Sequence, residues 1–314
     1  MSAESAEEPL RPLASDEADH EPADEALWNE SWYFDFADPA AGLGGWIRLG
    51  LYPNEGRAWI NALLCGPGLP TVALNDFHAA VPEDPNRVRT AGITLTHQAE
   101  EPLRSYRVTV TGRGVVYDDP AAALAGNAGR PAEVSLDLVW TTNGEPYAYR
   151  FATRYEIPCT VSGRVVVDGV SHTIAAAAGQ RDHSWGVRDW WAMDWVWTAL
   201  HLDDGTHLHA VDIRIPGAPP IGIGYVQRDG DRLVELQTAE AREVFAPNGL
   251  PVSTELLLRP GELEVSTQVV AHAPVRLVAD DGRVADFPRA WMSVRTADGR
   301  TGVGWMEWNR NLAR

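Results

Sequence analysis

Short strand-like segments separated by tight turns run along most of this chain. Alternating or β-branched apolar runs occupy residues 45–52, 147–157, 207–215 and 263–270, which is typical of β-strands. Helical periodicity is confined to short stretches at 121–128 and 237–245. Asn-Gly and Asp-Gly pairs favour the primed turns that join antiparallel strands, and they recur at Asn143-Gly144, Asp168-Gly169, Asp204-Gly205, Asp229-Gly230, Asp281-Gly282 and Asp298-Gly299. The pattern predicts an all-β fold of antiparallel barrels or sandwiches.

The length of 314 residues favours two β domains packed together. The expected boundary lies near residues 171–182, which gives an N-terminal domain at 27–176 and a C-terminal domain at 177–314. Residues 1–25 carry nine acidic side chains and a single arginine, Arg11. Because so acidic a segment cannot bury much apolar surface, residues 1–26 are expected to form a disordered acidic tail.

Several functions are excluded by composition. The net charge of −18 opposes contact with a phosphate backbone, so no nucleic-acid partner is expected. All 26 basic residues are arginine, which removes lysine Schiff bases and P-loop lysines. No stretch is apolar for 18 residues, so no membrane span is expected. The start lacks a signal-peptide pattern, and Cys65 and Cys159 are read as free thiols of a cytoplasmic protein.

A tryptophan-rich motif is the first candidate for a site. Five of the 13 tryptophans lie between residues 185 and 197, interleaved with charged residues. Charges placed among aromatic rings are partly desolvated, which shifts pKa values and permits acid–base chemistry. We expect this motif to form a loop that supplies the site, and its candidates are Arg181, Asp182, His183, Trp185, Asp189, Trp190, Trp191, Trp195 and Trp197.

A predicted strand at residues 207–215 follows the motif. Because side chains alternate between faces, Ala210 and Asp212 share one face. An Asp is disfavoured within a strand, so Asp212 has a specific role: an acid in a cavity or an ion-pair partner of Arg214. In the closing segment, Trp305, Glu307 and Asn309 alternate on one face, and we expect them to close a barrel rather than line a cavity.

The spacing of His183, Trp185 and Asp212, with the Asp 29 residues after the His, resembles the carotenoid 1,2-hydratase (hydroxyneurosporene synthase, CrtC-like) family. AttH-like proteins, kievitone hydratases and lipocalin-like Diels–Alderases are its relatives. The stretch from Asp182 to Asp189 resembles uncharacterised actinobacterial members. The resemblance implies two lipocalin-like β-barrel domains around an apolar cavity, and hydration of a C=C bond without metal or organic cofactor. Where the carotenoid enzymes have a tyrosine, this chain has Ala210.

From these residues we expect a hydratase, dehydratase or isomerase acting on a C=C bond of a terpenoid, steroid or polyketide-like molecule. Asp212, kept neutral by burial, would protonate carbon. His183 would orient the acid or take a proton from water, and Trp185 with Trp195 or Trp197 would stabilise a cation. The account requires Asp212 and His183 to share one apolar chamber. The partner is a hydrophobic small molecule, and the sequence leaves the oligomeric state open.

Three alternatives stay open at the level of sequence. The chain could be a non-catalytic carrier of an apolar ligand, or a pericyclase that uses a rigid cavity to preorganise its substrate. Tryptophans beside carboxylates also suit a carbohydrate-processing protein. His201, His207 and His209 include an HxH pair, but the neighbouring residues of a cupin metal site are missing, so no metal is expected.

Overall fold

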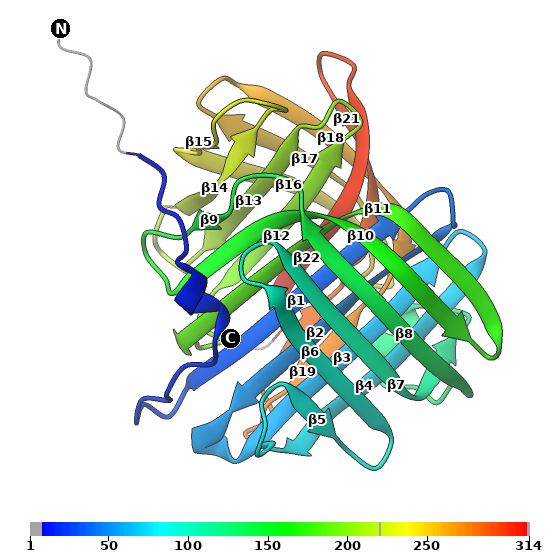
Figure 1. Cartoon of the computed structure of the whole chain (residues 1–314). Coiled ribbons are helices and arrows are strands. Elements are labelled where there is room, and N and C mark those ends of the chain that lie inside the picture. The colour runs from blue at the N-terminus through cyan, green and yellow to red at the C-terminus, as the bar shows by residue number, and fades with distance from the viewer. Residues whose placement is uncertain (1–7, 220, 313–314) are drawn as a thin grey trace, which may run out of the picture.

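Two large antiparallel sheets make up the protein in a computed structural model that describes residues 8–219 and 221–312. The first sheet runs from residue 28 to 187 and the second from 194 to 311, and they pack against each other (Figure 1). The prediction of an all-β fold with two packed antiparallel domains is confirmed. Both Cys65 and Cys159 are buried and free.

The first sheet closes into a barrel. Its strands follow the order β4-β3-β2-β1-β11-β10-β8-β7, and a further pairing of β4 with β7 completes the ring. The strands of this sheet are β1 (Trp28–Asp38), β2 (Leu43–Tyr52), β3 (Arg57–Gly66), β4 (Leu69–Ala80), β5 (Arg87–Arg89), β6 (Ile93–Glu101), β7 (Ser105–Tyr117), β8 (Arg130–Thr142), β9 (Tyr147–Ala148), β10 (Arg154–Val167) and β11 (Val170–Val187). The short helices are η1 (Ala14–Glu17), η2 (Pro53–Glu55) and α1 (Ala121–Leu124).

The second sheet is a half-barrel with the order β15-β14-β13-β12-β22-β21-β18-β17-β16. A small β19–β20 hairpin joins it through β22. Its strands are β12 (Asp194–Leu202), β13 (His207–Arg214), β14 (Ile221–Gln227), β15 (Val234–Glu235), β16 (Thr238–Phe245), β17 (Pro251–Arg259), β18 (Leu263–His272), β19 (Val275–Val278), β20 (Val284–Phe287), β21 (Ala290–Thr296) and β22 (Thr301–Asn311).

The burial pattern of each strand shows where the layers meet. Strand β8 alternates between buried and exposed residues, because one face packs on the barrel core and the other meets solvent. Strands β1 and β2 are buried at every residue. Their second face lies under the second sheet and carries polar side chains such as Ser31, Asp35 and Arg48 beside apolar ones. Any group placed on that second face is removed from water.

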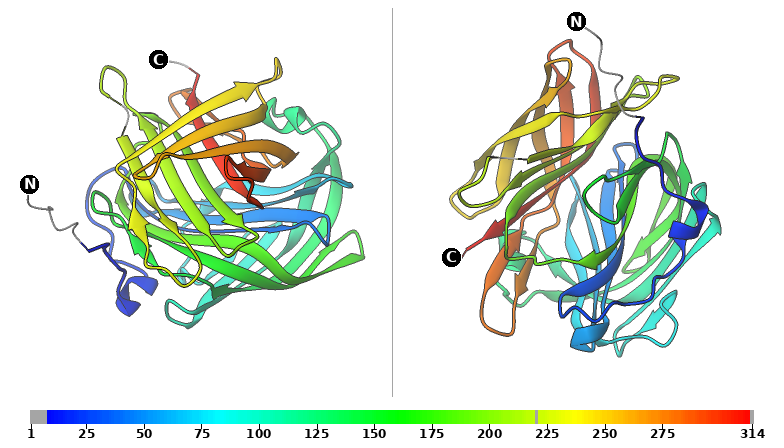
Figure 2. Two further views of the ribbon diagram at one scale, coloured as in Figure 1. Left: turned by 90° about the horizontal axis from the view of Figure 1, so that it is seen from above. Right: turned by 90° about the vertical axis from the view of Figure 1, so that its left-hand side faces the viewer.

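The contact between the sheets contains the tryptophans of both halves. Trp46 Nε1 donates to the carbonyl oxygen of Ala273 at 3.0 Å, and Trp305 Nε1 donates to that of Phe36 at 2.8 Å. Each bond joins one sheet to the other, and a single apolar cluster includes Trp46, Trp197 and Trp305. The two sheets therefore share this cluster at their contact, while each also has an apolar core of its own; Figure 2 shows the two sheets facing each other.

Two features of the domain organisation differ from the expectation. The predicted boundary at 176/177 falls inside β11, and the chain changes sheet at residues 188–193. Of the expected acidic tail, residues 8–26 lie on the barrel, where Glu17 is buried and pairs with Arg181 at 2.8 Å. The buried Arg181 compensates the charge of Glu17, which the composition assigns to a solvated tail. Residues 1–7 lie outside the described part of the chain. Among the described residues, no helix is long and apolar enough to cross a membrane.

Candidate functional site

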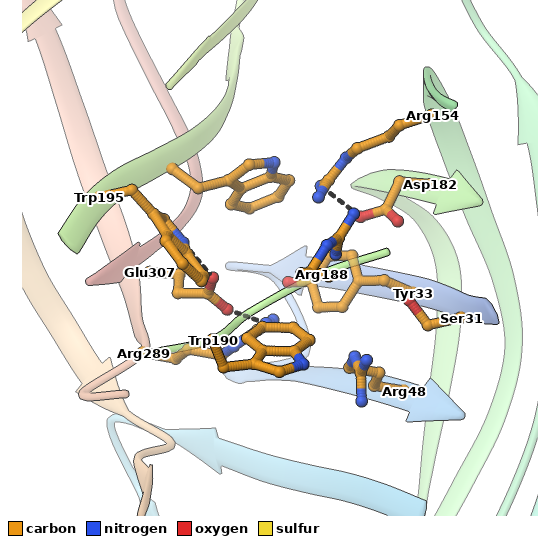
Figure 3. A pocket seen from close by; sticks show the side chains of 11 residues that line it. Ser31, Tyr33, Arg48, Arg154, Asp182, Arg188, Trp190, Trp195, Arg289 and Glu307 are labelled. Atoms are coloured by element: carbon orange, nitrogen blue, oxygen red, sulfur yellow. Dashed lines mark hydrogen bonds and ion pairs between the residues drawn. The ribbon is translucent and has the colours of Figure 1, made fainter. Parts of the chain in front are cut away.

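A small polar cavity lies between the two sheets, and we call it the inner pocket. Its volume of about 30 Å³ has room for two water-sized atoms. Strands β1, β2, β10 and β11 provide one wall, and the segment after β11 with β12 and β22 provides the other (Figure 3). The lining residues are Ser31, Tyr33, Arg48, Arg154, Asp182, Arg188, Trp190, Trp195, Trp197, Arg289 and Glu307.

A larger apolar cavity, the vestibule, adjoins the inner pocket. Its volume is about 290 Å³, and the two cavities share Arg154, Arg188, Trp195 and Trp197. Aliphatic and aromatic side chains form most of its wall, so an apolar molecule in the vestibule would point one end at the charged inner pocket. The remaining lining residues of the vestibule are Tyr149, Phe151, Ala152, Val187, Asp189, Met193, Val211, Ile213 and Ile223.

The alternation of β11 decides which residues of the tryptophan-rich motif reach the inner pocket. The motif begins as a strand and not as a loop, since β11 continues to Val187. Successive side chains of a strand point to opposite faces, so Asp182 faces the second sheet while Arg181 and His183 face the barrel interior. The motif is thereby divided between two environments.

Asp182 is the motif carboxyl that lines the inner pocket. It is 6% exposed, and its Oδ2 accepts a hydrogen bond from Arg154 Nη2 at 2.7 Å. Burial raises the pKa of Asp182 to about 6, although the positive charge of Arg154 opposes the rise. A carboxyl with a pKa near neutrality can both donate and accept a proton, which is the property required of a general acid–base group.

Carboxylates hold the two tryptophans of β12 in place. Trp197 Nε1 donates to Glu156 Oε1 at 3.1 Å, and Trp195 Nε1 donates to Glu307 Oε1 at 2.7 Å. Glu156 is fully buried on β10, so the first bond joins the two sheets. Both indole rings are therefore fixed as walls, and their faces remain available to a ligand in the inner pocket or the vestibule.

A second buried carboxyl lies behind Tyr33. The Tyr33 hydroxyl lines the inner pocket and donates to Asp35 Oδ2 at 3.1 Å, while Asp35 Oδ1 accepts from the Gln180 backbone N–H at 2.8 Å. Burial raises the pKa of Asp35 well above its usual value, and burial also raises the pKa of Tyr33. The Tyr33 hydroxyl and the Asp35 carboxyl thus form a hydrogen-bonded pair that extends from the pocket wall into the protein.

His183 lies in the barrel interior, where it fastens the N-terminal segment. Its Nδ1 lies 2.8 Å from the Asp16 carbonyl oxygen and its Nε2 lies 2.9 Å from Glu30 Oε1. Burial lowers the pKa of His183 to about 4 and raises that of Glu30 to about 7. A neutral imidazole that donates from Nδ1 accepts at Nε2 from protonated Glu30. The opposite pKa shifts therefore agree with the geometry.

His20 completes a set of three groups that could hold a metal ion. The candidate ligand atoms of His20, Glu30 and His183 all lie within 4.8 Å of one another. Glu30 Oε1, however, is already within hydrogen-bond distance of both imidazoles, at 2.8 Å from His20 Nδ1 and 2.9 Å from His183 Nε2. The cluster is thus satisfied as a hydrogen-bonded triad.

Three other residues of the motif also lie outside the inner pocket. Trp185 stacks on His20 with a centroid distance of 3.8 Å, and Arg181 pairs with Glu17 and lies 5.2 Å from the Tyr106 ring centroid. Trp191 is partly buried beside the contact between the sheets. Of the motif residues proposed for the site, the structure brings Asp182, Trp190, Trp195 and Trp197 together in the inner pocket and places Asp189 in the vestibule.

The structure does not bring Asp212 and His183 together. Asp212 shares a face of β13 with Ala210, which packs in the core of the second sheet, whereas Val211 and Ile213 line the vestibule. Asp212 Oδ2 accepts hydrogen bonds from Arg214 Nη2 at 2.9 Å and from the Ala241 backbone N–H at 3.1 Å. These bonds tie β13 to β16, which matches the ion-pair role considered for Asp212.

The histidines of β12 and β13 make hydrogen bonds, and among the described residues they belong to no group of three possible metal ligands. His209 Nε2 lies 2.7 Å from the Tyr149 hydroxyl, and its Nδ1 lies 2.8 Å from the Thr198 carbonyl oxygen. His201 Nδ1 and His207 Nδ1 lie 2.9 Å apart. Burial lowers the pKa of His209 to about 3, so this imidazole is neutral beside the vestibule.

Several pocket residues lie outside the motif. Arg48, Arg154 and Arg289 come from three distant segments, and Tyr33 and Ser31 come from β1. Glu307 corrects the expectation for the last strand, because it lines the inner pocket and pairs with Arg289. One sequence signal could have pointed to Arg48 as a site residue: it is a charged residue within an otherwise apolar strand, between Ile47 and Leu49 in β2.

A family model described as "Domain of unknown function (DUF7064)" matches residues 13–312 of the chain, whereas no curated protein matches it in sequence. Solved structures share the fold. The Nitrosomonas europaea protein NE1406, provisionally described as AttH, superposes with a TM-score of 0.64 at 16% identity, covering 90% of this chain and 92% of that one. Kievitone hydratase from Nectria haematococca gives 0.62 at 13% identity, covering 95% and 93%. CghA with Sch210972 gives 0.58 at 11% identity, covering 92% and 89%.

Proposed function

The chain belongs to the DUF7064 family, a domain of unknown function, and we propose that this member is an enzyme that adds water to, removes it from, or shifts a C=C bond of an apolar small molecule. The substrate occupies the vestibule and presents its reacting carbons to the inner pocket. The observation that carries the proposal is Asp182, a buried carboxyl with a pKa of about 6 on the wall of that pocket. A fold shared with kievitone hydratase supports the same reaction class.

The proton transfer runs through the Asp182 carboxyl. In hydration, protonated Asp182 gives its proton to one carbon of the double bond, and the oxygen of a water molecule bonds to the other. The water then returns one proton to the Asp182 carboxylate, so one H₂O is added and the acid is regenerated. Dehydration is the reverse sequence. If the carboxylate instead takes a proton from a different carbon, the double bond moves and no water is added.

The surroundings of Asp182 favour simultaneous proton transfer and bond formation over a free carbocation. Arg48 and Arg188 carry positive charge at the same pocket, and their guanidinium carbons lie 4.9 and 5.4 Å from the Trp190 ring centroid. The Trp190 face is thus already in contact with cations. Trp195 and Trp197 then act as walls that position the substrate, and they replace the cation-stabilising role expected for Trp185.

Turnover in D₂O tests this proposal. Apolar alkenes and their hydrated alcohols are incubated with the protein, and mass spectrometry detects added D₂O, lost water or carbon-bound deuterium. We expect Asp182→Asn to reduce the rate at least ~100-fold, the usual range for removal of a general acid. Asp212→Asn is the matched control and keeps the rate. Equal rates for wild type and Asp182→Asn would remove Asp182 as the acid.

A non-catalytic carrier gives a different result in the same experiment. An apolar compound would bind in the vestibule and be recovered without deuterium at carbon and without a change of mass. A pericyclase would also leave the number of hydrogen atoms unchanged but would convert its substrate, and Asp182→Asn would leave that conversion intact. The three functions are therefore separated by product mass together with the effect of one substitution.

A further inference from the structure

The inner pocket holds more positive charge than its carboxylates balance. Arg154 pairs with Asp182 and Glu156, each at 2.7 Å, and Arg289 pairs with Glu307. Arg48 and Arg188 line the same pocket, and within the described part of the chain neither guanidinium has a carboxylate oxygen within 4 Å. Two of the four arginines thus form no ion pair with a carboxylate of the described residues.

Arg188 has the fewest interactions of the four. Its side chain makes no hydrogen bond with any described residue, and the Trp190 ring is its nearest aromatic contact. In Figure 3 its guanidinium lies beside Asp182 and Arg154 at the centre of the pocket wall. Burial and the neighbouring charges of Arg154 and Arg48 lower the pKa of Arg188 to about 10, although the Asp182 carboxyl opposes the shift. The environment therefore destabilises this cation, and an anion beside it would offset that effect.

Arg48 and Arg289 also present donors to the pocket. Arg48 is 6% exposed, and its Nη2 donates to the Tyr52 hydroxyl at 3.1 Å. A Cβ at Gly50 would lie 2.5 Å from Arg48 Nη1, so the glycine provides the space that the guanidinium occupies. Arg289 is 7% exposed, and its Nε and Nη1 are buried without an acceptor among the described residues. Its buried N–H groups can therefore donate to an acceptor in the pocket, although its charge is already paired with Glu307.

We propose that Arg48, Arg188 and Arg289 bind the carboxylate of an apolar substrate, a step that rests on the function proposed above. Guanidinium groups match the two oxygens of a carboxylate, and three of them line the inner pocket. The apolar vestibule receives the remainder of the molecule. The substrate class is therefore a hydrophobic carboxylic acid, and not an uncharged hydrocarbon or alcohol.

Binding of decanoate and decanol tests the proposal, since the two probes differ at one end only. Isothermal titration calorimetry with the full chain, below the micelle concentration, is expected to show decanoate binding more than tenfold tighter than decanol. Arg188→Gln is expected to weaken decanoate binding at least tenfold and to change decanol binding less than twofold. Arg48→Gln repeats the test at a second residue. Arg113→Gln is the control, because Arg113 is 72% exposed and pairs with Glu133 on the barrel surface.

Three results would overturn the carboxylate site: equal affinities of the wild-type chain for the two probes, no saturable binding of either probe, or an unchanged preference in both Arg188→Gln and Arg48→Gln. Near-ultraviolet circular dichroism confirms that each variant keeps its tertiary packing. The proposed function can fail separately, because turnover by Asp182→Asn tests the acid while the decanoate preference needs no turnover. If Asp182→Asn kept its turnover and the chain still preferred decanoate to decanol, the carboxylate site would stand and Asp182 would be rejected as the acid.

Discussion

Arg154 donates a hydrogen bond from Nη2 to Oδ2 of Asp182 at 2.7 Å, between neighbouring strands β10 and β11. The same guanidinium pairs with Glu156, so it serves two buried carboxyls. An ion pair of this kind usually keeps a carboxyl well below neutrality. Here burial is the larger effect, and the pKa of Asp182 rises to about 6. Asp182 is therefore held in one orientation and still exchanges its proton near neutral pH.

Two arginines of the pocket are expected to differ in their effect on the free energy of unfolding, because Arg154 pairs with buried carboxyls and Arg188 does not. Arg188→Met is expected to stabilise the protein by roughly 1 kcal/mol, because it removes a partly buried cation that makes no hydrogen bond with a described residue. Arg154→Met is expected to destabilise it by about 3–5 kcal/mol, because Asp182 and Glu156 lose their partner. Urea unfolding of both variants measures the difference, and a loss of stability in Arg188→Met would show that Arg188 is structural.

Asp212 is expected to matter for stability and not for the ligand. Asp212→Asn weakens the charge-assisted bonds to Arg214 and to the Ala241 N–H, at a cost of about 1–3 kcal/mol. Ligand affinity should remain within twofold of wild type, because Asp212 points away from the vestibule. Urea unfolding and a decanoate titration on the same preparation measure both effects. If Asp212→Asn bound decanoate more weakly and kept its stability, Asp212 would have to be part of the binding site.

The Glu30 carboxyl predicts a pH-dependent change in stability. Its pKa is about 7 in the folded protein, above its ordinary value of 4.5. The folded state therefore holds a proton that the unfolded state releases between these values, and stability from this group declines as pH rises from 4.5 to 7. Glu30→Gln removes the decline, so the variant should gain about 3 kcal/mol relative to wild type between pH 4 and pH 8.

Urea unfolding at both pH values measures this gain, with Glu133→Gln on the exposed barrel surface as the control that shows none. With its amide nitrogen in the position of Oε1, the glutamine can donate one hydrogen to His20 Nδ1 and the other to His183 Nε2, which preserves both contacts of the triad. A difference between Glu30→Gln and wild type that stays constant with pH would contradict the raised pKa of Glu30.

The sequence predicts the fold well because its signals are local. Turns such as Asn143-Gly144 and Asp204-Gly205 do separate strands, since turn geometry is encoded by adjacent residues. The sequence could also predict which motif residues face the inner pocket, provided that residues 181–187 are recognised as a strand, because side chains alternate between its two faces with a two-residue period. That period separates Asp182 from Arg181 and His183 once β11 is known to extend to Val187.

The rest of the site depends on which strands become neighbours, and local periodicity carries no such information. Arg48 and Arg289 reach the inner pocket from segments 241 residues apart. Asp212 illustrates the opposite case: the sequence offers either an acid in a cavity or an ion pair with Arg214, two residues along the same strand. The structure decides for the ion pair, because β16 packs on that face and its Ala241 N–H also donates to Asp212. The unbalanced charge of the pocket likewise emerges only after the two sheets pack.

The pH dependence of kcat/KM is the most direct measurement of the central claim, that Asp182 donates the proton. For a hydrophobic acid that the wild-type protein hydrates, kcat/KM should fall about tenfold per pH unit above pH 6, because the reactive form of the free enzyme carries the Asp182 proton. Asp182→Asn should abolish this dependence together with most of the rate. A wild-type profile that stays flat between pH 5 and pH 8 would contradict the account.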